Sequence, residues 1–433
     1  MVNVDFNSLS SRINSTKTIT VKGKVKKVVG LTVEVEGIRA FVGEVCIIKN
    51  IDNNEIESEV VGFNGDTALL MPFDTTFGIA PGSEVIATGK ALTVKVSDSL
   101  LGRVLDGLGR DMRGYEPKAA IEYKLDRDPP NPLTRQRIKE IMTTGVRAID
   151  GFLTCGVGQR IGIFAGSGVG KSTLLGMIAK YSDADVNIIA LIGERGREVK
   201  EFIEKDLGEE GLKRSIVVVA TSDQSPIMRL KGAYSATSIA EYFRDKGLKV
   251  MMMMDSVTRF AMAQREIGLT IGEPPATKGY TPSVFAKLPR LMERTGNSEN
   301  GSITAFYTVL VDGDDMNEPI ADATRGILDG HIVFSRKIAS KNHYPAIDIN
   351  SSVSRLMSQI ADKDVKDKAG RVRDLLATYS ESEDLINIGA YQMGANKKVD
   401  EAINKIDSIN EFLKQRVEEY SSLNDTIEKL LSI

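Results

Sequence analysis

The sequence predicts an α/β protein with a parallel sheet at its centre, a small β-barrel before the sheet and a helical domain after it. Three regions of different pattern support this division of the 433-residue chain. Residues 18–89 alternate short β-rich runs with turns, residues 90–354 alternate apolar runs with helical stretches, and residues 355–433 are polar and helical. A chain of this length exceeds one ordinary domain, so several domains are expected.

The first part of the chain is expected to form an arm followed by a barrel. Residues 1–17 are polar and predict a short helix or arm. The runs TITVKGKVKKVV, LTVEVEGI, EIESEVVGFNGDTALLMPF and SEVIATG follow, separated by Gly and Asn-Asp breaks. Many short strands in close succession are typical of a small antiparallel barrel.

The central part carries apolar runs that predict a buried sheet. These runs are QRIGIFA, VNIIALIG, SIVVVATSD, KVMMMMD, SITAFYTVLV and GHIVFS. Because their hydrophobicity is nearly continuous, each is expected to be a strand buried on both faces, as in a parallel sheet with helical crossovers. Such sheets bind ligands at the carboxyl ends of their strands.

The last part is expected to be a helical bundle that packs on the central domain. Its apolar residues recur mostly at three- and four-residue steps and predict one stripe, which is also compatible with a partner-binding face. The stripe comprises Ile403, Ile406, Leu413, Val417, Tyr420, Leu423, Ile427 and Leu430.

Composition excludes several classes of function. Lys and Arg number 56 against 59 Asp and Glu, so the net charge of -3 does not draw the chain to nucleic acid or anionic lipid. Two cysteines, Cys46 and Cys155, and two histidines are too few for a zinc cluster or a disulfide framework. The N-terminus lacks the apolar core of a signal peptide, and no run approaches the roughly 20 apolar residues of a membrane span. A cytoplasmic protein is therefore expected.

The stretch FAGSGVGKST, residues 164–173, has the form of a phosphate-binding loop between a strand and a helix. Its frame begins on Ala165 instead of Gly, at a position on the strand side where a small side chain suffices. The glycines let backbone N–H groups point at phosphate oxygens, Lys171 supplies charge to the β- and γ-phosphates, and the hydroxyl of Ser172 can ligate Mg²⁺. The expected nucleotide-binding residues are Gly166, Ser167, Gly168, Val169, Gly170, Lys171, Ser172 and Thr173.

Two carboxylates at strand ends are expected to complete this site. Asp255 ends the run KVMMMMD, where a carboxylate can hold Mg²⁺ through a water. Glu194 follows VNIIALIG in the turn GERGRE, where it can orient and polarise an attacking water. The alternative for Glu194 is a surface residue paired with Arg195 or Arg197.

One arginine is a candidate for the positive charge that phosphoryl transfer needs as negative charge develops. Arg355 ends the stretch YPAIDINSSVSR, and an arginine in this role can contribute roughly 10³ to 10⁵ in turnover. The sequence leaves open whether Arg355 acts in its own subunit, in a neighbouring subunit, or in a structural ion pair.

Several long stretches carry further information: GRVLDGLGRDMRG, GERGREVKEFIE, ATSDQSPIMRLKGAYSATSIAEYFRDKG, DSVTRFAMAQREIGLTIGEPPATKGYTPSVFAKLPRLMER, DGDDMNEPIADATRGILDGHIVFSR and YPAIDINSSVSR. Together they resemble the flagellar and type III secretion ATPases, which are relatives of the catalytic subunits of rotary ATP synthases. The loop FAGSGVGKS is common in the secretion branch of this family, so the resemblance implies that Ala165 marks that branch.

The resemblance implies a RecA-like P-loop NTPase domain with an N-terminal β-barrel and a C-terminal helical domain, assembled as a homohexamer. ATP is the implied substrate and Mg²⁺ the implied cofactor. Glu194 is then the catalytic carboxylate, with Lys171 and Arg195 in the same site. Arg259 contacts the nucleotide phosphates, and Arg355 acts across the subunit interface.

The resemblance also implies the residues that hold adenine and the partners of the protein. Tyr344 stacks on adenine, and Tyr391 in the loosely matching stretch GAYQMGANKKVD is a candidate for the C-terminal adenine wall. The implied partners are regulatory and central-stalk proteins of the export apparatus, the export gate at the membrane, and export substrates with their chaperones; no nucleic acid is expected. The protein is then cytoplasmic and peripherally associated with the export apparatus at the inner membrane.

The implied function is an ATP-hydrolysing motor of flagellar protein export that releases or unfolds substrates, and four alternatives remain. An injectisome ATPase shares the same motifs. A catalytic subunit of a rotary ATP synthase fits less well because the C-terminal domain is short, and a non-catalytic ring subunit would have Gln in place of Glu194. An RNA translocase would need stacking aromatics and basic residues in the N-terminal part, whose aromatics are Phe41, Phe63, Phe73 and Phe77 amid mixed charges.

Overall fold

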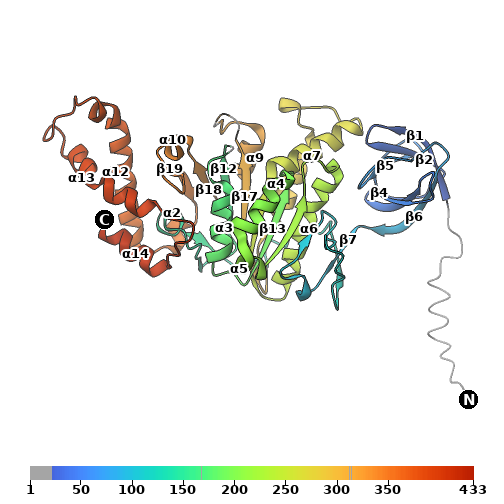
Figure 1. The fold of residues 1–433 in the computed structure, drawn as a ribbon, viewed down its shortest axis with the longest axis horizontal. Helices are drawn as coiled ribbons and strands as arrows, with labels where there is room; N and C mark the ends of the chain where they lie inside the picture. The colour runs from blue at the N-terminus through green and yellow to red at the C-terminus, as the bar shows by residue number, and fades with distance from the viewer. Residues whose placement is uncertain (1–21, 167, 312, 314) are drawn as a thin grey trace, which may run out of the picture. The chain divides into compact units, whose positions relative to one another are not determined.

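The computed structural model describes residues 22–433 except 167, 312 and 314, and it divides into two compact units. One unit comprises the chain up to Leu92 together with Ile267–Glu273, and the other comprises Thr93–Glu266 and Pro274–Ile433. Figure 1 shows the ribbon coloured from the blue N-terminal strands to the red C-terminal helices. The predicted N-terminal arm, residues 1–17, lies outside the described residues.

The first unit contains the predicted barrel, which is closed and antiparallel in the order β1-β2-β5-β4-β3-β6. Pairing of β1 with β6 closes it and leaves no free strand edge. The side chains alternate: in β1, Lys24 and Lys26 are exposed while Val25 between them is buried. The strands are β1 (Lys22–Val29), β2 (Thr32–Glu36), β3 (Glu44–Lys49), β4 (Glu55–Asn64), β5 (Thr67–Pro72) and β6 (Glu84–Ala91).

The second unit is built on a large sheet in the order β19-β18-β12-β17-β15-β13-β14-β8, with β16 beside β17. The predicted apolar runs form β12 to β15, β17 and β18, and these strands are parallel as expected. The strands are β8 (Val104–Leu105), β12 (Arg160–Ala165), β13 (Val186–Ile192), β14 (Ser215–Ala220), β15 (Lys249–Asp255), β16 (Gly296–Asn297), β17 (Ser302–Leu310), β18 (Gly330–Phe334) and β19 (Ile347–Ser354).

β19 differs from its neighbours because it runs antiparallel to β18. An antiparallel strand at the edge of an otherwise parallel sheet is common in such folds. Ile347 pairs with Phe334 and Ser354 pairs with Gly330, so β19 begins at the carboxyl edge of the parallel strands and ends at their amino edge. Smaller two-stranded sheets pair β7 (Thr93–Val96) with β9 (Ile121–Lys124), and β10 (Ile141–Met142) with β11 (Cys155–Gly156).

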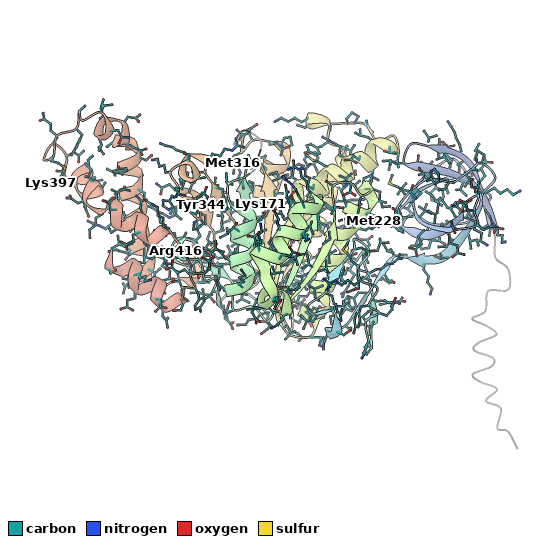
Figure 2. All side chains as sticks on the ribbon, in the orientation of Figure 1. Lys171, Met228, Met316, Tyr344, Lys397 and Arg416 are labelled. Atoms are coloured by element: carbon teal, nitrogen blue, oxygen red, sulfur yellow. The ribbon has the colours of Figure 1, made fainter. Side chains whose placement is uncertain are left out.

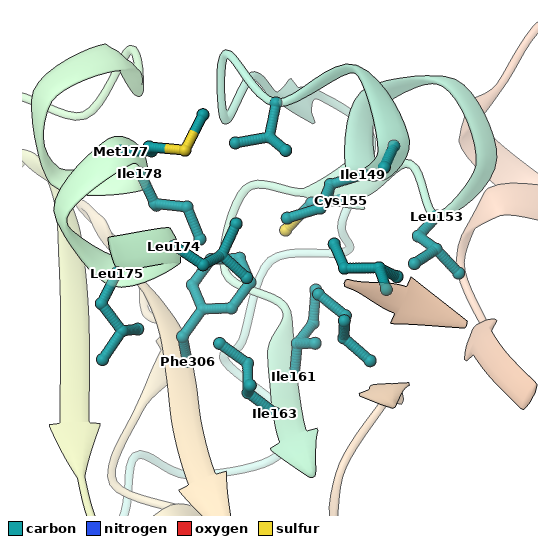
Figure 3. Close-up of a cluster of buried hydrophobic side chains, with 14 of the residues drawn as sticks. Ile149, Leu153, Cys155, Ile161, Ile163, Leu174, Leu175, Met177, Ile178 and Phe306 are labelled. Carbon is teal, nitrogen blue, oxygen red and sulfur yellow. The ribbon is translucent and has the colours of Figure 1, made fainter. Parts of the chain in front are cut away.

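Helices of the second unit share an apolar core with the sheet. Figure 3 shows side chains of α2 (Arg147–Phe152) and α3 (Lys171–Tyr181) packing with Ile161 and Ile163 of β12 and Phe306 of β17. Burying one such side chain contributes about 1.5–3 kcal/mol, so this core anchors the start of α3. The other helices here are α4 (Gly196–Glu201), α5 (Gly208–Lys213), α6 (Pro226–Asp245), α7 (Val257–Thr270), α8 (Pro282–Met292), α9 (Pro319–Ile327) and α10 (Arg336–Ser340), with 3₁₀ turns η1 (Asp98–Leu100) and η3 (Thr277–Gly279) and a π-helical segment η2 (Phe202–Leu207).

The C-terminal helices belong to the same compact unit as the sheet. The limits of the three expected domains, residues 18–89, 90–354 and 355–433, remain predictions. The prediction of one continuous apolar stripe is wrong. A loop at residues 414–422 divides it, because Ser422 accepts a hydrogen bond from the N–H of Asp425 and starts a new helix. The helices are α11 (Met357–Ile360), α12 (Lys363–Asn387), α13 (Lys397–Leu413) and α14 (Leu423–Ser432). Within the described part of the chain, none of the helices combines the length and apolar character of a membrane span.

Candidate active site

The phosphate-binding loop joins the carboxyl end of β12 to the start of α3. Ala165 is the buried last residue of β12 and pairs with Leu310 of β17, so its methyl group lies within a strand and leaves the loop geometry intact. Gly168 and Gly170 have φ angles of 76° and 95°, which favour glycine. The first N–H groups of α3 have no partner within the helix, which makes this helix start suitable for binding an anion. Ser167 lies outside the described residues.

Three predicted site residues lie together beside this loop. Lys171 Nζ lies 2.5 Å from Oδ1 of Asp255 and 3.7 Å from Oε1 of Glu194. Asp255 ends β15 and Glu194 follows β13, which is the neighbouring strand. All three side chains are largely buried. The carboxyl edge of the sheet thus brings together residues that are 84 positions apart in the sequence.

The position of Asp255 depends on a residue that the sequence analysis missed. The hydroxyl of Thr308 donates a hydrogen bond of 2.8 Å to Oδ1 of Asp255. Thr308 is fully buried in β17, the strand between β12 and β15. A polar residue inside the apolar run SITAFYTVLV was the available signal, because a buried hydroxyl needs a partner.

Burial and charge shift the protonation of this cluster. Burial raises the pKa of Glu194 to about 7, the charge of Asp255 adds to this, and Lys171 opposes it. Burial alone would lower the pKa of Lys171, but the charges of Asp255 and Glu194 outweigh it and hold the pKa above its ordinary value. Glu194 is therefore poised to exchange a proton near neutral pH, while Lys171 stays charged.

Arg195 lies at the surface, whereas Arg259 packs beside the cluster formed by Lys171, Glu194 and Asp255. Arg195 is 66% exposed and pairs with Glu198 at 3.0 Å. Arg259 of α7 packs over the turn before Glu194, because a Cβ on Gly193 would lie 2.7 Å from Cβ of Arg259. Nε of Arg259 is buried and has no hydrogen-bond partner among the described residues, so it can serve a bound anion.

Arg355 lies at the opposite edge of the sheet from the loop. It follows β19, whose last residue pairs with the first residue of β18, and its N–H donates to the carbonyl of Asp329. The eight residues of β19 span about 25 Å, since each residue of an antiparallel strand advances about 3.4 Å. The side chain is exposed and donates to the carbonyl of Arg325. The fold thus separates Arg355 from the Lys171 cluster of its own chain.

Tyr344 lies at the loop edge, just before β19 begins. Its ring is beside Gly170, where a Cβ would lie 3.6 Å from Cδ1 of the tyrosine. Both residues line a cavity of about 1400 Å³, together with Thr173 and Leu174 of α3. Figure 2 marks Lys171, Tyr344 and Arg416 on the ribbon.

The far wall of this cavity comes from the C-terminal part of the chain. It includes Lys414, Gln415, Arg416 and Val417, in the loop that divides α13 from α14. The candidate Tyr391 does not line this cavity, and its hydroxyl donates to the carbonyl of Asn396 and to the carboxylate of Asp400 at the start of α13. The sequence offered no signal for the residues that form the wall.

The arrangement can bind a nucleoside triphosphate and take a proton from a water beside it. The loop and Lys171 can bind phosphates, the cavity can hold a base and ribose, and Glu194 can accept a proton. The described residues hold no group of three or more His, Cys, Asp and Glu that could bind a metal ion by themselves. A divalent cation here would therefore rely on Ser172, Asp255 and phosphate oxygens, the oxygen donors that Mg²⁺ prefers.

Family models match each part of the chain. Residues 145–354 match the nucleotide-binding domain of the ATP synthase alpha/beta family, and residues 25–89 match the beta-barrel domain of the same family. Residues 361–432 match the C-terminal domain of the T3SS EscN ATPase.

Characterised relatives match over nearly the whole length. The chain is 59% identical to the flagellum-specific ATP synthase of Bacillus subtilis, with 98% of each chain covered. It is 54% identical to the type 3 secretion system ATPase of Xanthomonas euvesicatoria, covering 95% of this chain and 93% of the relative. Among solved structures, the assembled ATPase EscN from enteropathogenic E. coli is 46% identical with a TM-score of 0.90, covering 95% of this chain and 99% of that one.

Proposed function

This chain belongs to the family of flagellum-specific ATP synthases and type III secretion system ATPases, and we propose that it is the ATP-hydrolysing motor of a flagellar protein export apparatus. The single observation that carries the catalytic part is the contact of Lys171 with Asp255 and Glu194 at the end of the phosphate-binding loop. A charged donor for phosphates and a carboxylate that can accept the proton of a water meet there, and both serve the hydrolysis of a phosphoanhydride.

In this proposal each residue has one role. Backbone N–H groups of Gly166 to Gly170 and the charge of Lys171 hold the phosphates. Glu194 accepts a proton from the attacking water. Arg259, with its unpartnered Nε, contacts the phosphates. Tyr344 packs on the adenine, and Arg195 stays at the rim of the site.

The implied Mg²⁺ fits the donors that the chain provides. Ser172 follows Lys171 at the start of α3, and Asp255 is a buried carboxylate held by Thr308. These residues would hold the cation together with the phosphates, whose negative charge it neutralises when bound.

The proposed assembly is a homohexameric ring that works with a central stalk. A structure of EscN in complex with its central stalk EscO is 45% identical to this chain, with a TM-score of 0.88 and 95% of this chain covered. The separation of Arg355 from the Lys171 cluster supports a site shared between subunits. We extend the proposal to a cytoplasmic location at the membrane-bound export gate, with regulatory proteins, export substrates and chaperones as further partners.

The comparisons bear differently on the alternatives to flagellar export. The flagellum-specific relative from Bacillus subtilis is 59% identical and the type 3 secretion relative from Xanthomonas euvesicatoria 54%, so the choice between flagellar and injectisome export rests on the export test below. The match of residues 361–432 to the C-terminal domain of secretion ATPases disfavours a catalytic subunit of a rotary synthase.

The functional proposal is tested in the organism that carries the gene. Replacing the gene with a Glu194→Gln copy is expected to abolish export of flagellar filament protein and swimming, while the protein remains at its normal level. A Glu201→Gln copy, altered at an exposed carboxylate on α4, is the matched control and is expected to swim normally. Normal filaments with Glu194→Gln, or loss of secretion of injected effector proteins alone, would contradict the flagellar assignment.

The raised pKa of Glu194 predicts how activity depends on pH. The carboxyl group accepts a proton only when ionised, so kcat/KM for ATP is expected to rise as pH passes upward through about 7. For a single group with this pKa, kcat/KM increases about tenfold between about pH 6 and pH 8. Steady-state hydrolysis at low ATP concentration measures this, and a flat or falling profile across that range would rule out Glu194 as the titrating base.

A further inference from the structure

Several hydrogen bonds attach the C-terminal wall of the nucleotide cavity to the nucleotide domain. The N–H of Gln415 donates to the carbonyl of Tyr344 at 3.0 Å. Tyr344 in turn lies beside Gly170 of the phosphate-binding loop. The position of the loop at residues 414–417 and the position of Tyr344 are thus linked directly.

Arg147, at the start of α2, holds the same loop from the other side. Its Nε donates to the carbonyl of Phe412 at 2.8 Å, one Nη donates to the carbonyl of Lys414, and the other contacts the carboxylate of Glu419. The side chain is 4% exposed. Removing a guanidinium from water is costly, and the cost is offset only where several oxygens satisfy it in a defined geometry.

Gln415 adds further bonds with its side-chain amide, beside the hydroxyl of Tyr181 in α3, which donates to the carbonyl of Val417 at 2.9 Å. Its Nε2 donates to the carbonyls of Gly145 at 2.8 Å and Glu419 at 2.7 Å, while its Oε1 accepts from the N–H of Arg147 at 2.8 Å. Gln415 lines the cavity, and both N–H groups of its amide are bonded to carbonyls of the protein.

The attachment rests on the same core that supports the phosphate-binding loop. Ile149 and Phe152 of α2 share a buried cluster with Leu174 and Leu175 of α3, as Figure 3 shows for three of these side chains. Phe152 also packs edge-to-face on Phe412, with ring centroids 5.8 Å apart. The C-terminal wall and the phosphate-binding loop therefore pack on the same buried cluster.

We propose that Arg147 and Gln415 are positioning residues that set the distance between the C-terminal wall of the cavity and the phosphate-binding loop, and thereby determine how tightly the nucleoside part of ATP is held. This rests on the proposed function, since it assumes that the cavity holds the nucleoside of ATP. Neither residue touches the reacting atoms. Their loss is expected to weaken binding of the nucleoside, leaving phosphate binding and the chemical step nearly unchanged.

The test compares two ligands on the full-length protein with Mg²⁺: ATP, and inorganic tripolyphosphate, which lacks the nucleoside. For Arg147→Met we expect the Kd and KM for ATP to rise about tenfold, with kcat changed by less than about threefold and the Kd for tripolyphosphate changed by less than about twofold. Arg147→Lys keeps the charge but not the planar fork, and is expected to show an intermediate Kd for ATP.

Arg373→Met is the matched control. Arg373 is also a partly buried arginine that joins the C-terminal helices to the sheet, through the carbonyls of Phe152, Ile349 and Ser352, but it does not line the cavity. A merely structural role for Arg147 predicts that both variants lower the Tm alike and leave the Kd for ATP unchanged. The proposal predicts a raised Kd for ATP in Arg147→Met alone.

The possible outcomes separate this proposal from the proposed function. If the wild-type protein hydrolyses ATP and folded Arg147→Met keeps the wild-type Kd for ATP, the positioning role is overturned and the ATPase assignment stands. Equal losses for ATP and tripolyphosphate also overturn it. If Arg147→Met does not fold, Gln415→Met is expected to raise the Kd for ATP while the Kd for tripolyphosphate changes by less than about twofold, and an unchanged Kd for ATP in that variant overturns the proposal. A wild-type protein that does not hydrolyse ATP contradicts the proposed function itself.

Discussion

Replacing Glu194 with Gln is expected to reduce ATP hydrolysis by about a thousandfold, a typical contribution of a positioned proton acceptor, while ATP binding stays nearly intact. The amide has nearly the same size but cannot take the proton of the attacking water. The substitution also removes a negative charge that lies 3.7 Å from Lys171, so phosphate binding is not weakened, because one source of repulsion for the phosphates is lost. Phosphate release under saturating ATP measures the first effect, and a binding titration measures the second.

The control for Glu194→Gln is Glu201→Gln, which makes the same chemical change on an exposed residue of the following helix. This variant is expected to hydrolyse ATP at the wild-type rate. Turnover of Glu194→Gln within about tenfold of wild type would show that another group accepts the proton, because a lost general base costs more than that. Loss of ATP binding in the same variant would instead indicate a damaged site.

Arg355→Ala is expected to reduce turnover by about 10³-fold or more, and to be complemented by Glu194→Gln subunits in mixed assemblies. β19 carries Arg355 to the edge opposite the Lys171 cluster of its own chain, and the proposal that Arg355 serves the site of a neighbouring subunit follows from this separation. In a ring with one interface per subunit, random mixing of the two inactive variants in equal amounts gives about a quarter of the interfaces an intact Glu194 facing an intact Arg355. Partial recovery of hydrolysis on mixing measures this directly.

Arg371→Ala is the control for this experiment, since Arg371 is an exposed arginine of α12 that pairs with Glu401. It is expected to retain activity alone and in mixtures. Specific activity of the wild-type protein should also increase with protein concentration as subunits assemble. Mixed rings that verifiably contain both inactive variants but show no recovered hydrolysis would contradict a shared site.

Local patterns in the sequence were sufficient for the barrel, the parallel sheet and the cluster around Lys171. Alternating apolar runs indicate strands buried on one face, and continuous apolar runs indicate strands buried on both. These patterns can be recognised from residues that are close together in the sequence. Lys171, Glu194 and Asp255 were identifiable because each follows or ends such a run, and the carboxyl ends of parallel strands meet at one edge. Thr308 was missed because its partner, Asp255, lies 53 residues away.

Only the tertiary structure decided where the ends of β19 lie and what forms the far wall of the nucleotide cavity. The same residues could form a parallel or an antiparallel edge strand, and the direction determines whether Arg355 or Tyr344 lies beside the loop. The bond between Arg147 and Gln415 joins residues 268 positions apart. The sequence by itself therefore determined the chemistry at the strand ends. Pairing of distant segments, which depends on how the whole chain closes, decided that Arg355 lies away from the Lys171 cluster of its own chain and that the loop at residues 414–417 lies across the cavity from the phosphate-binding loop.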